Sequence, residues 1–103
     1  GRLVQLHPKT YLPSDIIAAV CQTMKLSEQV ITARTRQREA VKARNLVMYL
    51  IKKYTDSSLG EVGKYVHRDH ATVAYSLSAM ESQMSYDAVL RQEVATIERQ
   101  LGR

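Results

Sequence analysis

The stretch "SLGEVGKYVHRDHATVAYS", residues 58–76, decides the fold of this chain. Its first four residues have the pattern of a capping box, in which the side chains of Ser58 and Glu61 each accept a hydrogen bond from the other's backbone N–H. The pattern predicts a short helix over residues 59–66, a turn at residues 66–68, and a second helix over about residues 69–84. Two helices joined by a tight turn, the second opening with polar side chains, are typical of a helix-turn-helix.

The second of these helices mixes two kinds of side chain. An apolar stripe begins at Val73 and continues at helical spacing, which indicates the face that packs on a core. Polar residues precede that stripe, and in a helix-turn-helix this end of the second helix enters the DNA major groove. His70 lies near the core side of the helical wheel, so packing beneath the turn is the alternative for its side chain. The inward-facing residues are Val73, Leu77, Met80 and Met84.

The rest of the chain also predicts helices, because it has only four glycines and two prolines. We expect helices over residues 13–24, 28–34 (with Ser27 as the cap), 38–54 and about 86–101, which gives an all-α bundle of about five to six helices. Residues 1–12 show no period and are expected to form an extended arm before a single domain, residues 13–103. The expected core positions are Ile16, Ile17, Val20, Met24, Ala40, Ala43, Val47, Leu50, Ile51, Tyr54, Tyr86, Leu90, Val94, Ile97 and Leu101.

Positive charge is concentrated in one part of the chain. Residues 34–53 contain seven basic residues and one acid, a net charge of +6, against +5 for the whole chain. In the predicted helix over residues 38–54, several of the basic side chains share the face opposite the apolar stripe. Such a concentration favours a polyanionic partner over a merely solvated helix face. The basic residues are Arg34, Arg36, Arg38, Lys42, Arg44, Lys52 and Lys53.

Several function classes find little support. His67, Asp69 and His70 lack a nearby fourth ligand for zinc, and Asp69 and His70 are neighbours that face differently on a helix. The glycines do not form a phosphate-binding loop. We therefore expect no metal, no cofactor and no enzymatic activity. Cys21 has no partner in the chain and lies in an apolar run, which indicates a buried, inert thiol and a cytoplasmic protein.

With these residues in view, the sequence resembles the C-terminal DNA-binding domain of the bacterial replication initiator DnaA. The family signature, Arg-Asp-His-Ser/Thr-Thr-Val, is matched by residues 68–73, "RDHATV". Its Ser-Leu-x-x-Ile-Gly element is matched by residues 58–63, and its basic loop and following helix by "ARTRQREAVKARNLVMYL". The resemblance runs from residue 14 to about residue 101. It implies a Trp-repressor-like helix-turn-helix fold and sequence-preferring binding of double-stranded DNA at the nucleoid, as in the recognition of a nine-base-pair box at a replication origin.

The resemblance also implies roles for individual residues. Asp69, His70 and Thr72 would approach base edges in the major groove, while Arg36 from the basic loop would enter the adjacent minor groove. These roles suit the side chains, because Asp accepts from cytosine and Thr offers a methyl group to thymine, while a narrow minor groove attracts Arg. The residues expected to hold phosphates are Arg34, Arg38, Lys42, Arg44, Lys52 and Arg68.

Two departures from the family pattern bear on specificity. Ala71 stands where Ser or Thr is frequent, and the turn Val66-His67-Arg68 is one residue shorter and lacks the family's glycines. His67 is therefore the residue expected to take a positive φ. The resemblance does not extend to an ATPase module.

Two other functions stay open. One is a DnaA-like regulator of transcription or of a mobile element, with no part in replication initiation. The other is a non-catalytic protein-interaction module that docks a partner through the last helix, whose apolar spacing resembles a short coiled-coil seam.

Overall fold

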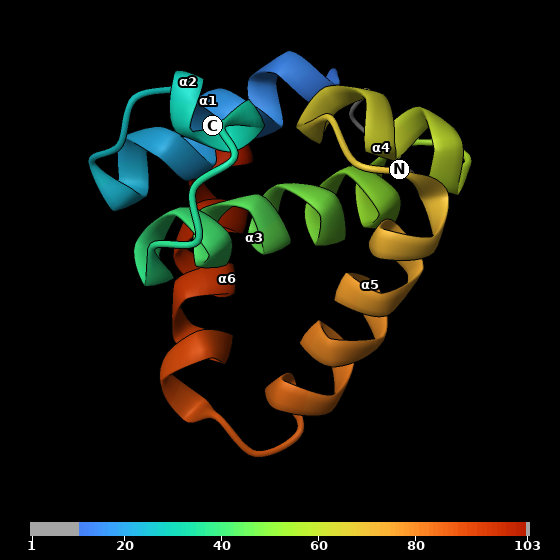
Figure 1. Cartoon of the computed structure of the whole chain (residues 1–103). Coiled ribbons are helices and arrows are strands. Elements are labelled where there is room, and N and C mark those ends of the chain that lie inside the picture. The colour runs from blue at the N-terminus through green and yellow to red at the C-terminus, as the bar shows by residue number, and fades with distance from the viewer. Residues whose placement is uncertain (1–10, 103) are drawn as a thin grey trace, which may run out of the picture.

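The computed structural model describes residues 11–102, and this part of the chain consists of helices, turns and loops without strands (Figure 1). The all-α prediction is confirmed. The predicted arm lies outside the described residues apart from Tyr11 and Leu12. None of the helices in the described part is long and apolar enough to cross a membrane. The helices are α1 (Pro13–Met24), α2 (Gln29–Thr32), α3 (Arg38–Tyr54), α4 (Leu59–Val66), α5 (His70–Met84) and α6 (Ala88–Leu101).

Helix α3 is the centre of the fold. It crosses the middle of the molecule in Figure 1 and contacts α1, α2, α4 and α5. Five of its six predicted core positions are buried, as the helical spacing of the sequence predicts, whereas Tyr54 is only half-buried. Helices α4 and α5 pack against each other and on α3, which forms the predicted helix-turn-helix. The buried residues of α3 are Ala40, Ala43, Arg44, Leu46, Val47, Met48, Leu50 and Ile51.

The predicted start of α4 is confirmed. The Ser58 hydroxyl accepts from the N–H of Glu61 (3.1 Å), and the Glu61 carboxylate accepts from the N–H of Ser58 (2.7 Å). These two bonds occupy donors that a helix N-terminus would otherwise leave unpaired. The pKa of Glu61 is lowered chiefly by the bond from the Ser58 backbone.

The last helix begins later than the sequence predicts. The Asp87 carboxylate accepts from the N–H of Leu90 (3.0 Å), so Asp87 is the N-cap and α6 starts at Ala88. Tyr86 therefore precedes the helix and is 74% exposed, and its prediction as a core residue is wrong. The other four predicted positions on this helix are buried in the shared core, where they serve the bundle and leave no free coiled-coil seam. They are Leu90, Val94, Ile97 and Leu101.

The second helix is shorter than predicted. The Ser27 hydroxyl accepts from the N–H of Gln29 (3.2 Å), but α2 ends at Thr32. Ala33 has an extended backbone (φ −70°, ψ 156°), so the chain leaves the helix there. The segment from Ala33 to Gln37, which we call the basic loop, leads into α3.

Candidate nucleic-acid interface

The turn between α4 and α5 depends on two residues with special backbone requirements. His67 takes a left-handed conformation (φ 57°) and ends α4, as the sequence predicts. The N–H groups of His67 and Arg68 both donate to the carbonyl of Gly63. A Cβ atom on Gly63 would lie 2.2 Å from the carbonyl oxygen of Arg68, so only glycine allows the turn to come this close.

Helix α5 begins with a polar, exposed turn. The Asp69 carboxylate accepts from the N–H of Thr72 (2.8 Å), and this backbone bond is the main cause of its lowered pKa. The carboxylate is therefore ionised at neutral pH and completes the helix N-terminus. His70, Ala71 and Thr72 are all exposed, whereas Val73 is fully buried. The structure thus does not pack His70 beneath the turn.

The basic loop carries exposed arginines. Arg34 and Arg36 project from the loop, and Arg38 is the first residue of α3; all three are exposed. The Thr35 hydroxyl accepts from the N–H of Gln37 (3.1 Å), which helps to shape the end of the loop. These three cations are available to an external partner.

Arg44 differs from the exposed phosphate-binding residue that we expected. Its side chain is only 6% exposed. Nε donates to the carbonyl of Ile31 (3.1 Å), and Nη2 donates to those of Ala33 (3.0 Å) and Thr35 (3.3 Å). Burial, and then the charge of Arg68, lower the pKa of Arg44. The sequence could not reveal this, because the carbonyls that bind the side chain come from a separate segment.

Arg68 also reaches the basic loop. Nη1 donates to the carbonyls of Val66 (2.9 Å) and His67 (3.1 Å), and Nη2 donates to the carbonyl of Ala33 (3.0 Å). The side chain remains partly exposed. It therefore links the α4–α5 turn to the basic loop, two segments far apart in the sequence.

The lysines of α3 fall into two groups. The Lys42 ammonium lies 2.6 Å from a Glu93 carboxylate oxygen, and the Lys53 ammonium lies 2.6 Å from that of Glu98. Lys52 is exposed and donates to the carbonyl of Ser57 (2.9 Å). The solvent-facing stripe predicted for α3 is thus partly wrong, because Lys42 is half-buried between α3 and α6 and is neutralised there.

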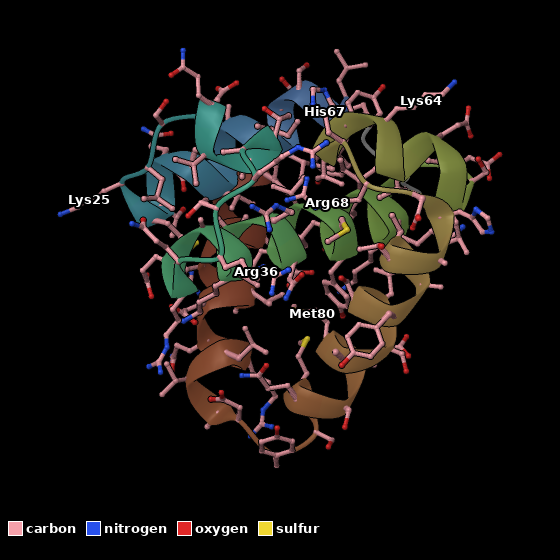
Figure 2. All side chains as sticks on the ribbon, viewed as in Figure 1. Lys25, Arg36, Lys64, His67, Arg68 and Met80 are labelled. Carbon is pink, nitrogen blue, oxygen red and sulfur yellow. The ribbon has the colours of Figure 1, made fainter. Side chains whose placement is uncertain are left out.

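The basic loop and the start of α5 border one hollow of about 540 Å³. Figure 2 shows Arg36, His67 and Arg68 around the basic loop and the α4–α5 turn. Arg38 and Lys42 border a second, adjacent depression, while Lys52 lies near the start of α4. The six predicted site residues that line the hollow are Arg34, Arg36, Arg44, Arg68, Asp69 and Thr72.

Four residues that the sequence did not assign to this site also line the hollow: Thr32, Thr35, Val41 and His67. His67 ends α4, and Thr32 and Thr35 lie beside the arginines. Neither threonine belongs to a periodic pattern, so no sequence signal distinguished them from ordinary loop threonines. Gly63 contributes indirectly, because it allows the close approach of the Arg68 carbonyl in the α4–α5 turn. In the sequence, only its place in the element at residues 58–63 indicated a role.

Other chemistry is not visible in the described residues. They contain no group of three or more His, Cys, Asp or Glu side chains that could hold a metal ion. Cys21 is buried and forms no disulfide among the described residues, and burial raises its pKa, so the thiol stays protonated at neutral pH. The hollow beside α5 is therefore the candidate functional site.

Comparisons with known proteins point to one family. The profile described as "Bacterial dnaA protein helix-turn-helix" matches residues 13–79. The chain is 36% identical over 97 residues to the chromosomal replication initiator protein DnaA of Bacteroides thetaiotaomicron, covering 93% of the chain and 21% of that protein. It is 37% identical over 94 residues to the protein of the same name from Roseiflexus castenholzii, covering 90% and 20%. The chain thus spans about a fifth of the length of these relatives.

Proposed function

The chain belongs to the bacterial DnaA helix-turn-helix family, and from that premise we propose that it binds double-stranded DNA with a sequence preference and without catalysis. The observation that carries this proposal is the hollow between the basic loop and the start of α5. It brings a loop arginine, Arg36, to the same side of the molecule as the exposed first turn of a helix-turn-helix second helix. This side of the protein can then reach both the major and the minor groove of one duplex.

In the major groove, the first turn of α5 reads base edges. His70 and Thr72 are exposed, so both side chains can reach base edges. The Thr72 side chain also hydrogen-bonds the Asp69 carboxylate at the start of the helix. Asp69 uses one carboxylate oxygen to cap the helix, which leaves the other for a cytosine amine. Ala71 is exposed beside them and offers a methyl group to a thymine.

In the minor groove, Arg36 senses width and A·T content. A guanidinium enters a narrow, strongly negative groove most favourably, and A·T-rich segments provide such a groove. Arg36 is exposed on the basic loop, whereas Arg44 is held inside the fold. Arg34 and Arg38 are the neighbouring arginines with comparable exposure.

Phosphates are held by the exposed cations that border this face. We assign this role to Arg34, Arg38 and the exposed part of Arg68, which border the two depressions, and to Lys52, which is exposed near the start of α4. Lys42 contributes only after separating from Glu93, and Arg44 acts by shaping the loop. The set of proposed phosphate-binding residues is therefore smaller than the one expected from the sequence, which also included Lys42 and Arg44.

We further propose that the natural target is a site of the kind bound by the relatives, which are named chromosomal replication initiator proteins. The chain would then act at the nucleoid in the cytoplasm. A role as a DnaA-like regulator at other chromosomal sites uses the same chemistry and would differ only in the sequence that is bound.

A selection from a random duplex pool tests the proposal directly. We expect recovery of a short box flanked on one side by an A·T-rich segment, with affinity at least about a thousandfold above that for random duplex at moderate salt. Binding should weaken steeply as the salt concentration rises. Failure to enrich any sequence, together with no binding at low salt, would contradict the proposal.

A further inference from the structure

We propose that Arg44 and Arg68 are positioning residues that fix the separation between Arg36 and α5. The protein then contacts the minor groove and the major groove at one fixed spacing along the duplex. We call these two residues the arginine pair. The inference rests on the proposed DNA-binding function and goes beyond it. It states that two residues which need not touch a base determine the preferred spacing between the major-groove and minor-groove parts of the DNA site.

The arginine pair converges on a single backbone oxygen. Nη2 of Arg44 and Nη2 of Arg68 each lie 3.0 Å from the carbonyl oxygen of Ala33. Two cations this close repel each other, and the charge of Arg68 contributes to the lowered pKa of Arg44. The arrangement persists because each guanidinium donates to three backbone carbonyls.

These bonds connect three separate parts of the site. Arg44 extends from α3 and holds the carbonyls of residues 31, 33 and 35, which sets the path of the basic loop. Arg68 is anchored in the α4–α5 turn through Val66 and His67. Its other nitrogen reaches Ala33, three residues before Arg36. The basic loop is therefore tied directly to the turn that aims α5 (Figure 2).

The shape of the guanidinium is essential to this link. One Nη of Arg68 binds the turn while the other binds the loop, so a planar, two-ended donor is required. A lysine at this position keeps the charge but places it on a single compact ammonium. Arg68→Lys therefore separates the geometric role from a simple contribution of charge.

The test uses duplexes that carry the selected site and two versions in which the A·T-rich segment is moved one base pair toward or away from the box. We expect the wild-type protein to prefer the natural spacing by about tenfold, the size of one good groove contact. Arg68→Lys and Arg68→Gln should reduce this preference to about twofold or less, because the loop is free to follow the displaced segment. Arg68→Lys should keep the salt dependence of the wild type.

Arg99→Gln is the matched control, since Arg99 is an exposed arginine on α6 and, among residues 11–102, donates only to Thr96 of its own helix. It should keep the full spacing preference. If both Arg68 variants keep it as well, the inference is overturned while the proposed function stands. If the wild type has no spacing preference, then Arg36 and α5 do not contact two grooves at a fixed distance, and the inference is wrong as well. Thermal unfolding of each variant identifies folded samples, and the lysine variant suffices if the glutamine variant does not fold.

Discussion

His70 and Thr72 are exposed on the first turn of α5, so their contribution to reading DNA separates from any contribution to the fold. We expect Thr72→Ala and His70→Ala each to cost about 1–3 kcal/mol on the selected site. They should cost little on random duplex, where phosphates supply the affinity. Titrations on both duplexes measure the difference.

Thermal unfolding completes this prediction. Neither substitution removes a buried group, so the melting temperature should change little. Val73→Ala is the contrasting variant, because Val73 is fully buried and its truncation should lower the melting temperature. A lower melting temperature for His70→Ala with an unchanged base preference would remove His70 from the set of readers.

Gly63 gives a second prediction at the scale of one residue. Gly63→Ala should destabilise the domain by about 1–3 kcal/mol, because its Cβ would collide with the backbone carbonyl of Arg68 and push the turn outward. The control is Gly60→Ala on the same helix, whose Cβ would meet nothing closer than the Ser58 hydroxyl at 3.9 Å. That change should be neutral or stabilise by up to about 1 kcal/mol. Equal losses in chemical unfolding would contradict this account of the turn.

At the scale of the element, the cap of α5 makes stability depend on pH. The folded-state pKa of Asp69 lies below its ordinary value because the carboxylate accepts from the N–H of Thr72. Its stabilisation is therefore fully present above the unfolded-state pKa of about 3.9 and is lost as pH falls through the lower folded-state pKa. The difference in urea-unfolding stability between wild type and Asp69→Ala should shrink across that range. A difference that stays constant down to pH 2 would show that the ionised carboxylate is not responsible.

The helices were predictable from the sequence because their signals are local. Apolar spacing located α3, and the Ser58–Glu61 capping box located the start of α4. The start of α6 was not predictable in this way, because Asp87 caps the helix with its side chain and Tyr86 lies outside it. The predicted range for that helix included both residues, since helical spacing alone cannot tell which residue is the cap.

The candidate site was predictable only in part, because its geometry depends on contacts between distant segments. Nothing local to Arg44 indicates that the carbonyls of residues 31, 33 and 35 surround it. Lys42 and Lys52 look alike in the sequence, yet only Lys42 faces an acid of α6. The sequence identified the basic segment, and the fold determined which of its cations remain free.

At the scale of the whole molecule, acidic residues of α6 pair with some of the basic residues of α3 and leave others unpaired. Glu93 and Glu98 neutralise Lys42 and Lys53, and Glu98 also accepts from the Tyr54 hydroxyl (2.5 Å). Burial and this carboxylate raise the pKa of Tyr54 to about 12. Arg34, Arg36 and Arg38 remain exposed on and beside the basic loop, so positive charge stays available to DNA there. Lys25, Lys64, Arg91 and Arg99 are also exposed but lie elsewhere on the molecule.

Lys52 and Lys53 test this division of charge, because they are adjacent in sequence and differ in their partners. With about four to five phosphate contacts, the slope of log K against log salt concentration should be about −4 for the wild type. Lys52→Ala should weaken binding to all duplexes and make this slope shallower by about one. Lys53→Ala removes the same charge from a residue paired with Glu98 and should leave the slope unchanged while lowering the melting temperature slightly. If the two variants change the slope equally, then net charge governs the attraction and the pairing with α6 does not direct it.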